Sequence, residues 1–137
     1  PYLVSSCLEG VIAQRLVRRI CPKCAESAPL DPPLIPELEA QFGTGLDLSG
    51  IRTGTGCAEC NYTGYHGRTA LHEIMMVDDE IRAEIIASRP ANIIREVATR
   101  NGLTSLRQKG WKRVLRGETT VDEVLRVTQK QSYHSAT

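Results

Sequence analysis

The sequence has few aromatic residues, little net charge and no long apolar run. Phe, Trp and Tyr make up 4% of its 137 residues, so any packed core is predicted to be aliphatic. A formal net charge of +1 argues against a nucleic-acid-coating protein and against an acidic tail. No apolar run approaches the roughly 18–20 residues that span a bilayer, so we expect no transmembrane segment. The length suits about one domain.

Several catalytic signatures are also missing. There is no G-x-x-x-x-G-K-[ST] phosphate loop. No Ser/His/Asp or Cys/His set has a plausible acid–base pairing. His72 and Glu73 begin an H-E-x-x-H metal motif, but position 76 is Met76, so that motif fails. The first residue is Pro1 and no signal peptide is visible, so we expect a piece of a longer protein that is not an enzyme by itself.

Cysteines provide the strongest positive signal. Four of the five form two C-x-x-C pairs, Cys21 with Cys24 and Cys57 with Cys60. Two such turns supply the four ligands of a tetrahedral zinc ion, and without a secretory signal a metal site is favoured over disulfides. Four protein ligands leave no position for water, so the predicted Zn²⁺ is structural. The alternatives are redox-active or coincidental pairs.

Three other residues are weaker candidates. Cys7 lies on the apolar side of the first predicted helix and is interpreted as a buried small hydrophobe, with a fifth metal ligand or a reactive thiol as alternatives. His66 follows the second cysteine pair and is a minor alternative ligand. His134 is expected to face solvent in a frayed C-terminal tail.

Periodicity predicts a mainly α fold, α+β overall: a small helical bundle with a tetracysteine zinc-knuckle subdomain and a short β element. A first helix is expected over residues 3–19, since apolar residues recur at steps of four. A short helix is expected over 36–43, and an extended segment over Arg68 to Met75 that pairs near Ile51. Four helices should follow, with starts at Asp78 or Asp79, Pro90, Thr104 and Thr120, the last with Glu123 in a capping box.

The predicted organisation has four parts. Residues 1–20 are interpreted as a helix from the end of a larger core, and 21–66 as the zinc-binding subdomain. Residues 67–130 are interpreted as a helical domain, and 131–137 as a disordered tail.

The third of the last four predicted helices is basic. A solvated face is the default interpretation, a docking surface for an acidic partner is the alternative, and nucleic acid is not expected, because stacking aromatics are scarce. The basic residues are Arg107, Lys109, Lys112, Arg113 and Arg116.

Three stretches in this order carry a family resemblance: "VIAQRLVRRICPKC", "GCAECNYTGYHGRTALHEIMMVDDEIRAEI" and "NGLTSLRQKGWKRVLRGETTVDEVLRVT". The chain resembles, over about residues 3–128, the C-terminal part of the ATPases of type II secretion and type IV pilus assembly. The tetracysteine zinc subdomain of that family matches Cys21, Cys24, Cys57 and Cys60. "GRTALHE" is similar to the family pattern G-R-x-G-I-x-E, with Ala70 where Gly is frequent.

The resemblance implies a parent protein that is a homohexameric, ATP- and Mg²⁺-dependent motor on the cytoplasmic face of the bacterial inner membrane. Its partners would be the membrane platform and cytoplasmic-domain proteins of the machinery. The motor's phosphate loop would precede Pro1, so the fragment itself should not hydrolyse ATP. Gln14 and Arg15 are candidates for approaching the parent's nucleotide. The secretion branch is favoured over the pilus branch, and a free-standing zinc module that binds protein or nucleic acid is the alternative of another class.

Overall fold

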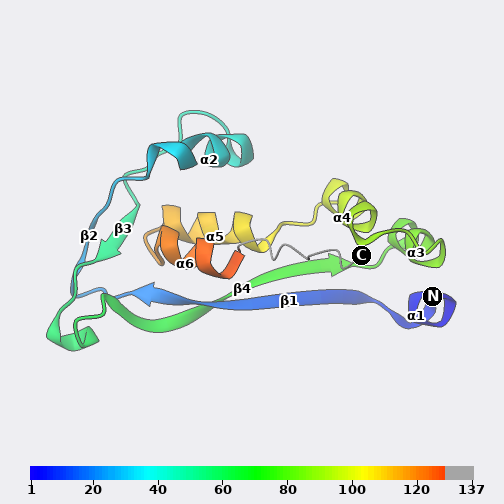
Figure 1. The fold of residues 1–137 in the computed structure, drawn as a ribbon, viewed down its shortest axis with the longest axis horizontal. Coiled ribbons are helices and arrows are strands. Elements are labelled where there is room, and N and C mark those ends of the chain that lie inside the picture. Colours follow the sequence, from blue (N-terminus) through cyan, green and yellow to red (C-terminus); the bar gives the residue numbers. More distant parts are fainter. Residues whose placement is uncertain (129–137) are drawn as a thin grey trace, which may run out of the picture. The chain divides into compact units, whose positions relative to one another are not determined.

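The computed structural model describes residues 1–128, which form helices and two small sheets in two compact units (Figure 1). The first unit contains Pro1–Gln14 and His72–Leu106, and the second contains Arg15–Leu71 and the chain from Arg107 onward. The predicted α+β class is confirmed. The predicted domain bounds at residues 20, 66 and 130 stay predictions, and the predicted tail, 131–137, lies outside the described residues.

The helix predicted over residues 3–19 is wrong. Helix α1 (Tyr2–Cys7) ends after six residues, and β1 (Gly10–Ile20) is an extended strand. The stretch after Gly10 is rich in β-branched residues, which favour a pleated, half-buried strand. Pairing with a distant strand therefore overrides the four-residue spacing of apolar residues.

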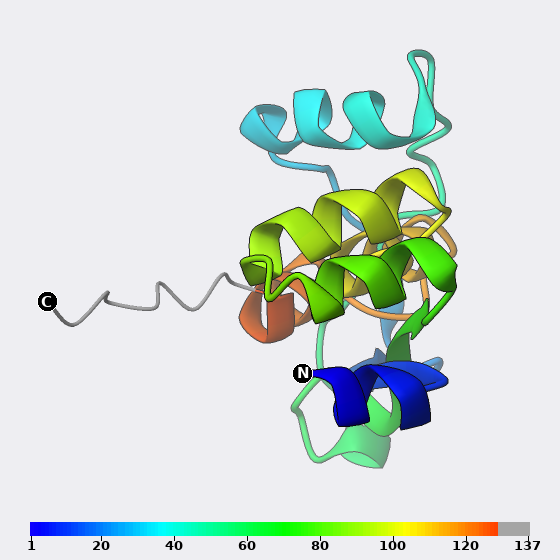
Figure 2. The same cartoon turned by 90° about the vertical axis from the view of Figure 1, so that its right-hand side faces the viewer.

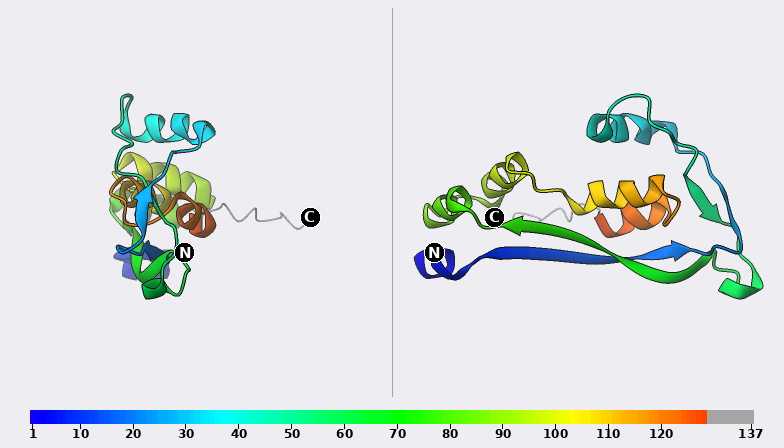
Figure 3. Two further views of the ribbon diagram at one scale, coloured as in Figure 1. Left: turned by 90° about the vertical axis from the view of Figure 1, so that its left-hand side faces the viewer. Right: turned by 180° about the vertical axis from the view of Figure 1, so that it is seen from behind.

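The extended segment predicted over 68–75 is confirmed, but its predicted partner is wrong. It is part of β4 (Tyr65–Met76), which pairs with β1 along its length and runs in the opposite direction (Figure 3). The short strand after Ile51, β3 (Arg52–Gly54), pairs instead with β2 (Ala25–Ser27) in an antiparallel register.

The first unit packs helices α3 (Asp79–Ile86) and α4 (Ala91–Arg100) side by side (Figure 2). Asp78 caps α3 as predicted, since its Oδ1 accepts the backbone N–H of Ile81 at 2.8 Å. Pro90 precedes α4, also as predicted. The buried core of this unit consists of Val77, Ile81, Val97 and Ala98.

The second unit contains the short helix η1 (Pro32–Leu34), α2 (Ile35–Phe42), the single turn η2 (Ala58–Cys60), α5 (Leu106–Leu115) and α6 (Val121–Thr128). Its core is aliphatic around one aromatic side chain, Trp111, which is fully buried. Helices α5 and α6 lie together (Figure 1), with Gly110 facing Val124. The other buried core residues are Leu30, Leu38, Ile51 and Val114.

The basic helix, α5, is partly neutralised within the second unit. Glu37 of α2 accepts hydrogen bonds from the Arg107 guanidinium and, at 3.0 Å, from the Trp111 indole N–H. Arg113 pairs with Glu118 beyond the end of the helix. The contacts of Glu37 also fasten α2, which lies between the two cysteine pairs in the sequence, onto α5.

Candidate metal centre

Backbone hydrogen bonds bring the two C-x-x-C turns together in the second unit. The N–H of Cys21 donates to the carbonyl of Gly64 at 2.9 Å, which ties the first turn to the loop after the second. The N–H of Thr55 donates to the carbonyl of Cys24 at 3.0 Å. Together with the β2–β3 pairing, these bonds hold the two turns together, although Cys21 and Cys57 are 36 positions apart in the sequence.

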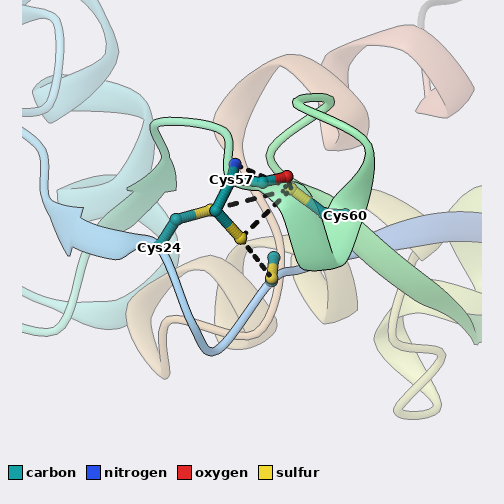
Figure 4. A group of neighbouring side chains, drawn as sticks. Cys24, Cys57 and Cys60 are labelled. Atoms are coloured by element: carbon teal, nitrogen blue, oxygen red, sulfur yellow. Dashed lines mark hydrogen bonds between the residues drawn. The ribbon is translucent and has the colours of Figure 1, made fainter.

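The four sulfur atoms of Cys21, Cys24, Cys57 and Cys60 all lie within 4.8 Å of one another. The Sγ–Sγ distances are 3.9 Å for Cys21 and Cys57, 3.9 Å for Cys24 and Cys60, and 3.7 Å for Cys57 and Cys60 (Figure 4). All four cysteines are free, so the cluster is not a pair of disulfides. Four thiolates around a tetrahedral zinc ion, each about 2.3 Å from it, lie about 3.8 Å apart. The cluster therefore fits a tetrahedrally bound metal ion.

The second turn depends on left-handed backbone conformations. Gly56 and Gly64 have φ values of 95° and 79°, and Asn61 and Tyr62 have 52° and 61°. These conformations direct backbone N–H groups at sulfur. Cys60 Sγ accepts from the N–H of Cys57 and of Gly64, each at 3.3 Å. Such bonds stabilise thiolates, the form in which cysteine binds a metal.

The surroundings shift the pKa values of two of the thiols. Burial of Cys60 opposes its ionisation, but the N–H donors of Cys57 and Gly64 hold the pKa of its thiol down at about 6. Burial raises the pKa of the Cys24 thiol to about 11, against one hydrogen bond from the N–H of Gly56. Because a metal ion requires all four sulfurs as thiolates, binding should release protons, with Cys24 contributing in particular.

The remaining candidates from the sequence lie apart from this group. Cys7 does not belong to the cluster, and its predicted burial is wrong: α1 ends at this residue and leaves it exposed. His66 is exposed and is also not in the group. In the first unit, His72 Nε2 lies 3.0 Å from the Oε1 atom of Gln14. His134 lies outside the described residues, and the role predicted for Arg15 is untested.

A polar cluster in the second unit was missed from the sequence. Glu123, 1% exposed, accepts hydrogen bonds from the backbone N–H and the guanidinium of Arg18 at 2.8–3.0 Å, and from Arg126 at 2.8 and 3.1 Å. The Arg18 guanidinium carbon lies 4.1 Å from the centre of the Tyr65 ring. One half of the capping box predicted for Thr120 and Glu123 is confirmed, because Thr120 Oγ1 accepts the N–H of Glu123 at 3.3 Å. The other half is wrong, because the Glu123 side chain accepts the backbone N–H of Arg18 instead. Arg18 lies in β1, three residues before Cys21, so this contact anchors the strand that leads into the first cysteine pair.

The family described as "Type II/IV secretion system protein" matches residues 1–126. The chain belongs to this family. The resemblance noted in the three sequence stretches is thereby confirmed. The four clustered cysteines all lie within the residues that match the family.

Relatives come from both branches of the Type II/IV secretion family. The "Type IV pilus assembly ATPase PilB" of Thermus thermophilus is 42% identical over 127 residues, which cover 91% of this chain and 14% of the relative. The "Type II secretion system protein E" of Pectobacterium carotovorum is 38% identical over 131 residues, or 96% of this chain and 25% of the relative. The "Type II secretion system ATPase E" of Vibrio cholerae is 39% identical over 130 residues, which cover 95% of this chain and 25% of the relative.

The chain thus spans 14–25% of the length of these relatives. Among the described residues, none of the helices has the length and apolar character needed to cross a membrane.

Proposed function

We propose that this chain is the zinc-binding C-terminal domain of a motor ATPase that powers type II protein secretion by assembling a pseudopilus. The observation that carries the proposal is the closed group of four cysteine sulfurs within 4.8 Å in a member of the Type II/IV secretion family. A site filled by four protein ligands is structural, since it leaves no position for a reacting water. The domain then acts as a stiff docking module, and hydrolysis belongs to the rest of the parent.

In this proposal one Zn²⁺ ion is bound by Cys21, Cys24, Cys57 and Cys60. The ion fastens residues 25–56, the segment between the two cysteine pairs, to the core of the second unit. ATP and Mg²⁺ bind in the parent homohexamer, on the cytoplasmic face of the inner membrane. Gln14 and Arg15 lie at the end of the motor core in this arrangement and are candidates for approaching the nucleotide. The surface of the module transmits motion to the membrane platform protein and to cytoplasmic-domain proteins of the machinery.

The same domain in a type IV pilus assembly ATPase is the alternative, and it is supported by the 42% identity to PilB of Thermus thermophilus. A test that separates the branches is a chimera in which this chain replaces the matching segment of the Vibrio cholerae ATPase E or of PilB. We expect the chimera with the Vibrio cholerae ATPase E to restore secretion. We expect the chimera with PilB not to restore piliation.

The role of the metal is tested in the chimera that functions, with Cys60→Ser as the variant and Cys7→Ser as the matched control. We expect Cys60→Ser to lose zinc and export together, and Cys7→Ser to keep both. Normal export by a Cys60→Ser chimera from which zinc is shown to be absent would refute the structural role.

A further inference from the structure

One short segment of the second unit holds the strand that leads into the first cysteine turn. This segment, residues 118–123, lies between α5 and α6, includes the first turn of α6 and is named the α5–α6 corner. Three hydrogen bonds join it to the end of β1: from the N–H of Ile20 to the carbonyl of Glu118 at 3.0 Å, from the hydroxyl of Thr119 to the carbonyl of Arg18 at 2.7 Å, and from the N–H of Arg18 to Oε2 of Glu123 at 2.8 Å. Since Cys21 follows β1 directly, the corner positions the backbone of this ligand.

The corner also holds the second cysteine turn, through Tyr65. The Tyr65 hydroxyl lies 2.8 Å from Oγ1 of Thr120. Tyr65 follows Gly64, whose N–H donates to Cys60 Sγ at 3.3 Å and whose carbonyl accepts the N–H of Cys21 at 2.9 Å. A single corner is thus connected to both turns of the metal centre.

The burial of Glu123 is not explained by α6 alone. The start of the helix needs a capping residue, and Thr120 is that residue, since its Oγ1 accepts the N–H of Glu123. A buried carboxylate is costly unless its oxygens are hydrogen-bonded. Those of Glu123 accept from the guanidinium of Arg126, on the same helix, and from both the backbone and the guanidinium of Arg18. What the burial adds beyond the helix is therefore a hold on β1.

We infer that Glu123 is a positioning residue of the metal centre, which acts through Arg18 on Cys21, and that the α5–α6 corner thereby sets the metal affinity of the four cysteines. The inference rests on the metal centre of the proposed function and names what regulates it. Because metal binding and the corner support the same backbone, each strengthens the other by the same factor. A displacement of α6 would weaken metal binding, and metal binding would fasten α6.

The first test uses the whole chain with Glu123→Gln, which keeps the size of the side chain and removes its charge. We expect this variant to bind zinc about tenfold or more weakly than the original chain, since groups that orient metal ligands typically contribute that much to affinity. Zinc affinity is measured by competition with a chromogenic chelator, after the zinc content of the original chain has been established.

Val124→Ala is the matched control. Val124 is the next residue of α6 and is fully buried. It lies in the core with Trp111 and Val114, and among the described residues this core cluster includes none from β1. The control should therefore unfold at lower denaturant concentration and keep the original zinc affinity. This comparison separates a loss of helix stability from a loss of the hold on β1.

A second test needs no substitution. In the original chain, hydrogen exchange at the amide of Arg18, which is bonded to Glu123, is compared with zinc bound and after chelation. Since the coupling is reciprocal, we expect exchange at this amide to become about fivefold or more faster on chelation.

Equal zinc affinities for Glu123→Gln and the original chain would overturn the inference, and so would an equal loss of affinity in Val124→Ala. If Glu123→Gln does not fold, the Arg18 amide decides, because exchange that chelation leaves unchanged would overturn the inference as well. In each of these cases zinc bound by the original chain still upholds the metal centre. An original chain that binds no zinc would refute the metal centre, and the inference with it.

Discussion

Gly54 and Gly64 approach each other so closely that neither position has room for a side chain. A Cβ atom added to Gly64 would lie 2.4 Å from the carbonyl oxygen of Gly54, and one added to Gly54 would lie 2.0 Å from the carbonyl oxygen of Gly64. Gly64 also has a φ of 79° and donates its N–H to Cys60 Sγ. The contact between β3 and the second cysteine turn is therefore part of the metal centre.

The first prediction concerns Gly64→Ala. The methyl group must displace the Gly54 backbone, and the left-handed conformation adds about 1–2 kcal/mol of strain. We expect the variant to lose thermal stability and to bind zinc at least about tenfold more weakly, since the donor to Cys60 moves with the backbone. Zinc affinity is measured by competition with a chromogenic chelator.

Gly67→Ala is the matched control. Gly67 has a similar φ of 76°, but a Cβ atom there would meet no atom within 4 Å. The strain should lower the free energy of unfolding of this variant by about 1–2 kcal/mol, and its zinc affinity should not change. Equal zinc affinities for the two variants would show that the close contact with Gly54 does not support the site.

Burial of Gly110 supports a second prediction, on the packing of α5 against α6. A Cβ atom at Gly110 would lie 2.5 Å from Cγ1 of Val124, which is fully buried and branched and so has little freedom to move. Gly110→Ala should therefore destabilise the fold by about 1–3 kcal/mol, although alanine is the better helix former.

Val124→Ala provides the test of that contact. Adding Val124→Ala to Gly110→Ala should recover part of the lost stability, with a coupling energy of about 0.5–3 kcal/mol. Denaturant unfolding can be followed by fluorescence of Trp111, the one tryptophan of the chain, which lies in the same core. Strictly additive effects of the two substitutions would contradict the packing.

The grouping of the four cysteines was predictable from the sequence, because the signal for it is local. A C-x-x-C turn directs two sulfurs to one point whatever surrounds it, and two turns make four ligands. The N-terminal helix was predicted too long, because the four-residue spacing of Leu3, Cys7 and Val11 continues past the end of α1 and into the strand β1. Gly10 and the β-branched Val11 and Ile12 after it were the available signal for a strand.

Contacts distant in the sequence could not be predicted. Arg18 and Glu123 are 105 positions apart, and Glu123 alone fits a capping box as well as it fits a buried ion pair. The exposure of Cys7 follows from the early end of α1, which the sequence did not predict either. What a single sequence leaves open is which elements pair.

The third prediction concerns Glu123 and pH. Burial opposes ionisation of its carboxyl, but hydrogen bonds from Arg126 and Arg18 hold the pKa of Glu123 down at about 2, from an ordinary value of 4.5. A carboxyl with a lowered pKa in the folded state stabilises the fold above the unfolded pKa, and that stability is lost as the pH falls through the folded value. The contribution at neutral pH is on the order of 3 kcal/mol.

Glu123→Gln should therefore unfold more easily at neutral pH, and its difference from the original chain should shrink as the pH falls from about 4.5 to about 2. The comparison at each pH removes effects common to both chains, such as loss of metal in acid. Asp122→Asn, at the exposed neighbouring position, is the control and should not reproduce this pH-dependent difference. A gap between Glu123→Gln and the original chain that does not change with pH would contradict the assignment.

The fourth prediction is the absence of DNA binding. Arg107 and Arg113 of the basic helix are paired with Glu37 and Glu118, so less positive charge is available than the sequence suggests. We expect no measurable binding to duplex DNA at physiological salt. Binding that weakens steeply as salt rises from 50 to 200 mM would support the free-standing nucleic-acid module instead.

The fifth prediction is that removal of the metal loosens the two cysteine turns before the helical cores. The strands β2 and β3 have three residues each, too few to hold residues 21–28 and 52–64 together without further support. Structural zinc supplies binding free energy on the order of 10 kcal/mol in zinc-finger peptides, so its loss should be felt most in these segments. Hydrogen exchange of the chain with zinc and after chelation measures this segment by segment.

After chelation we expect fast exchange at the amides of Cys21, Thr55 and Gly64, which donate hydrogen bonds that join or line the turns. Amides in α3 and α4 should keep their protection, because the core of the first unit contains none of the four metal ligands. Cys60→Ser should exchange like the chelated chain, and Cys7→Ser like the zinc-bound chain. If chelation left the amides of the turns protected, the hydrogen bonds and β2–β3 pairing alone would suffice to hold them, and the metal would not be the structural element.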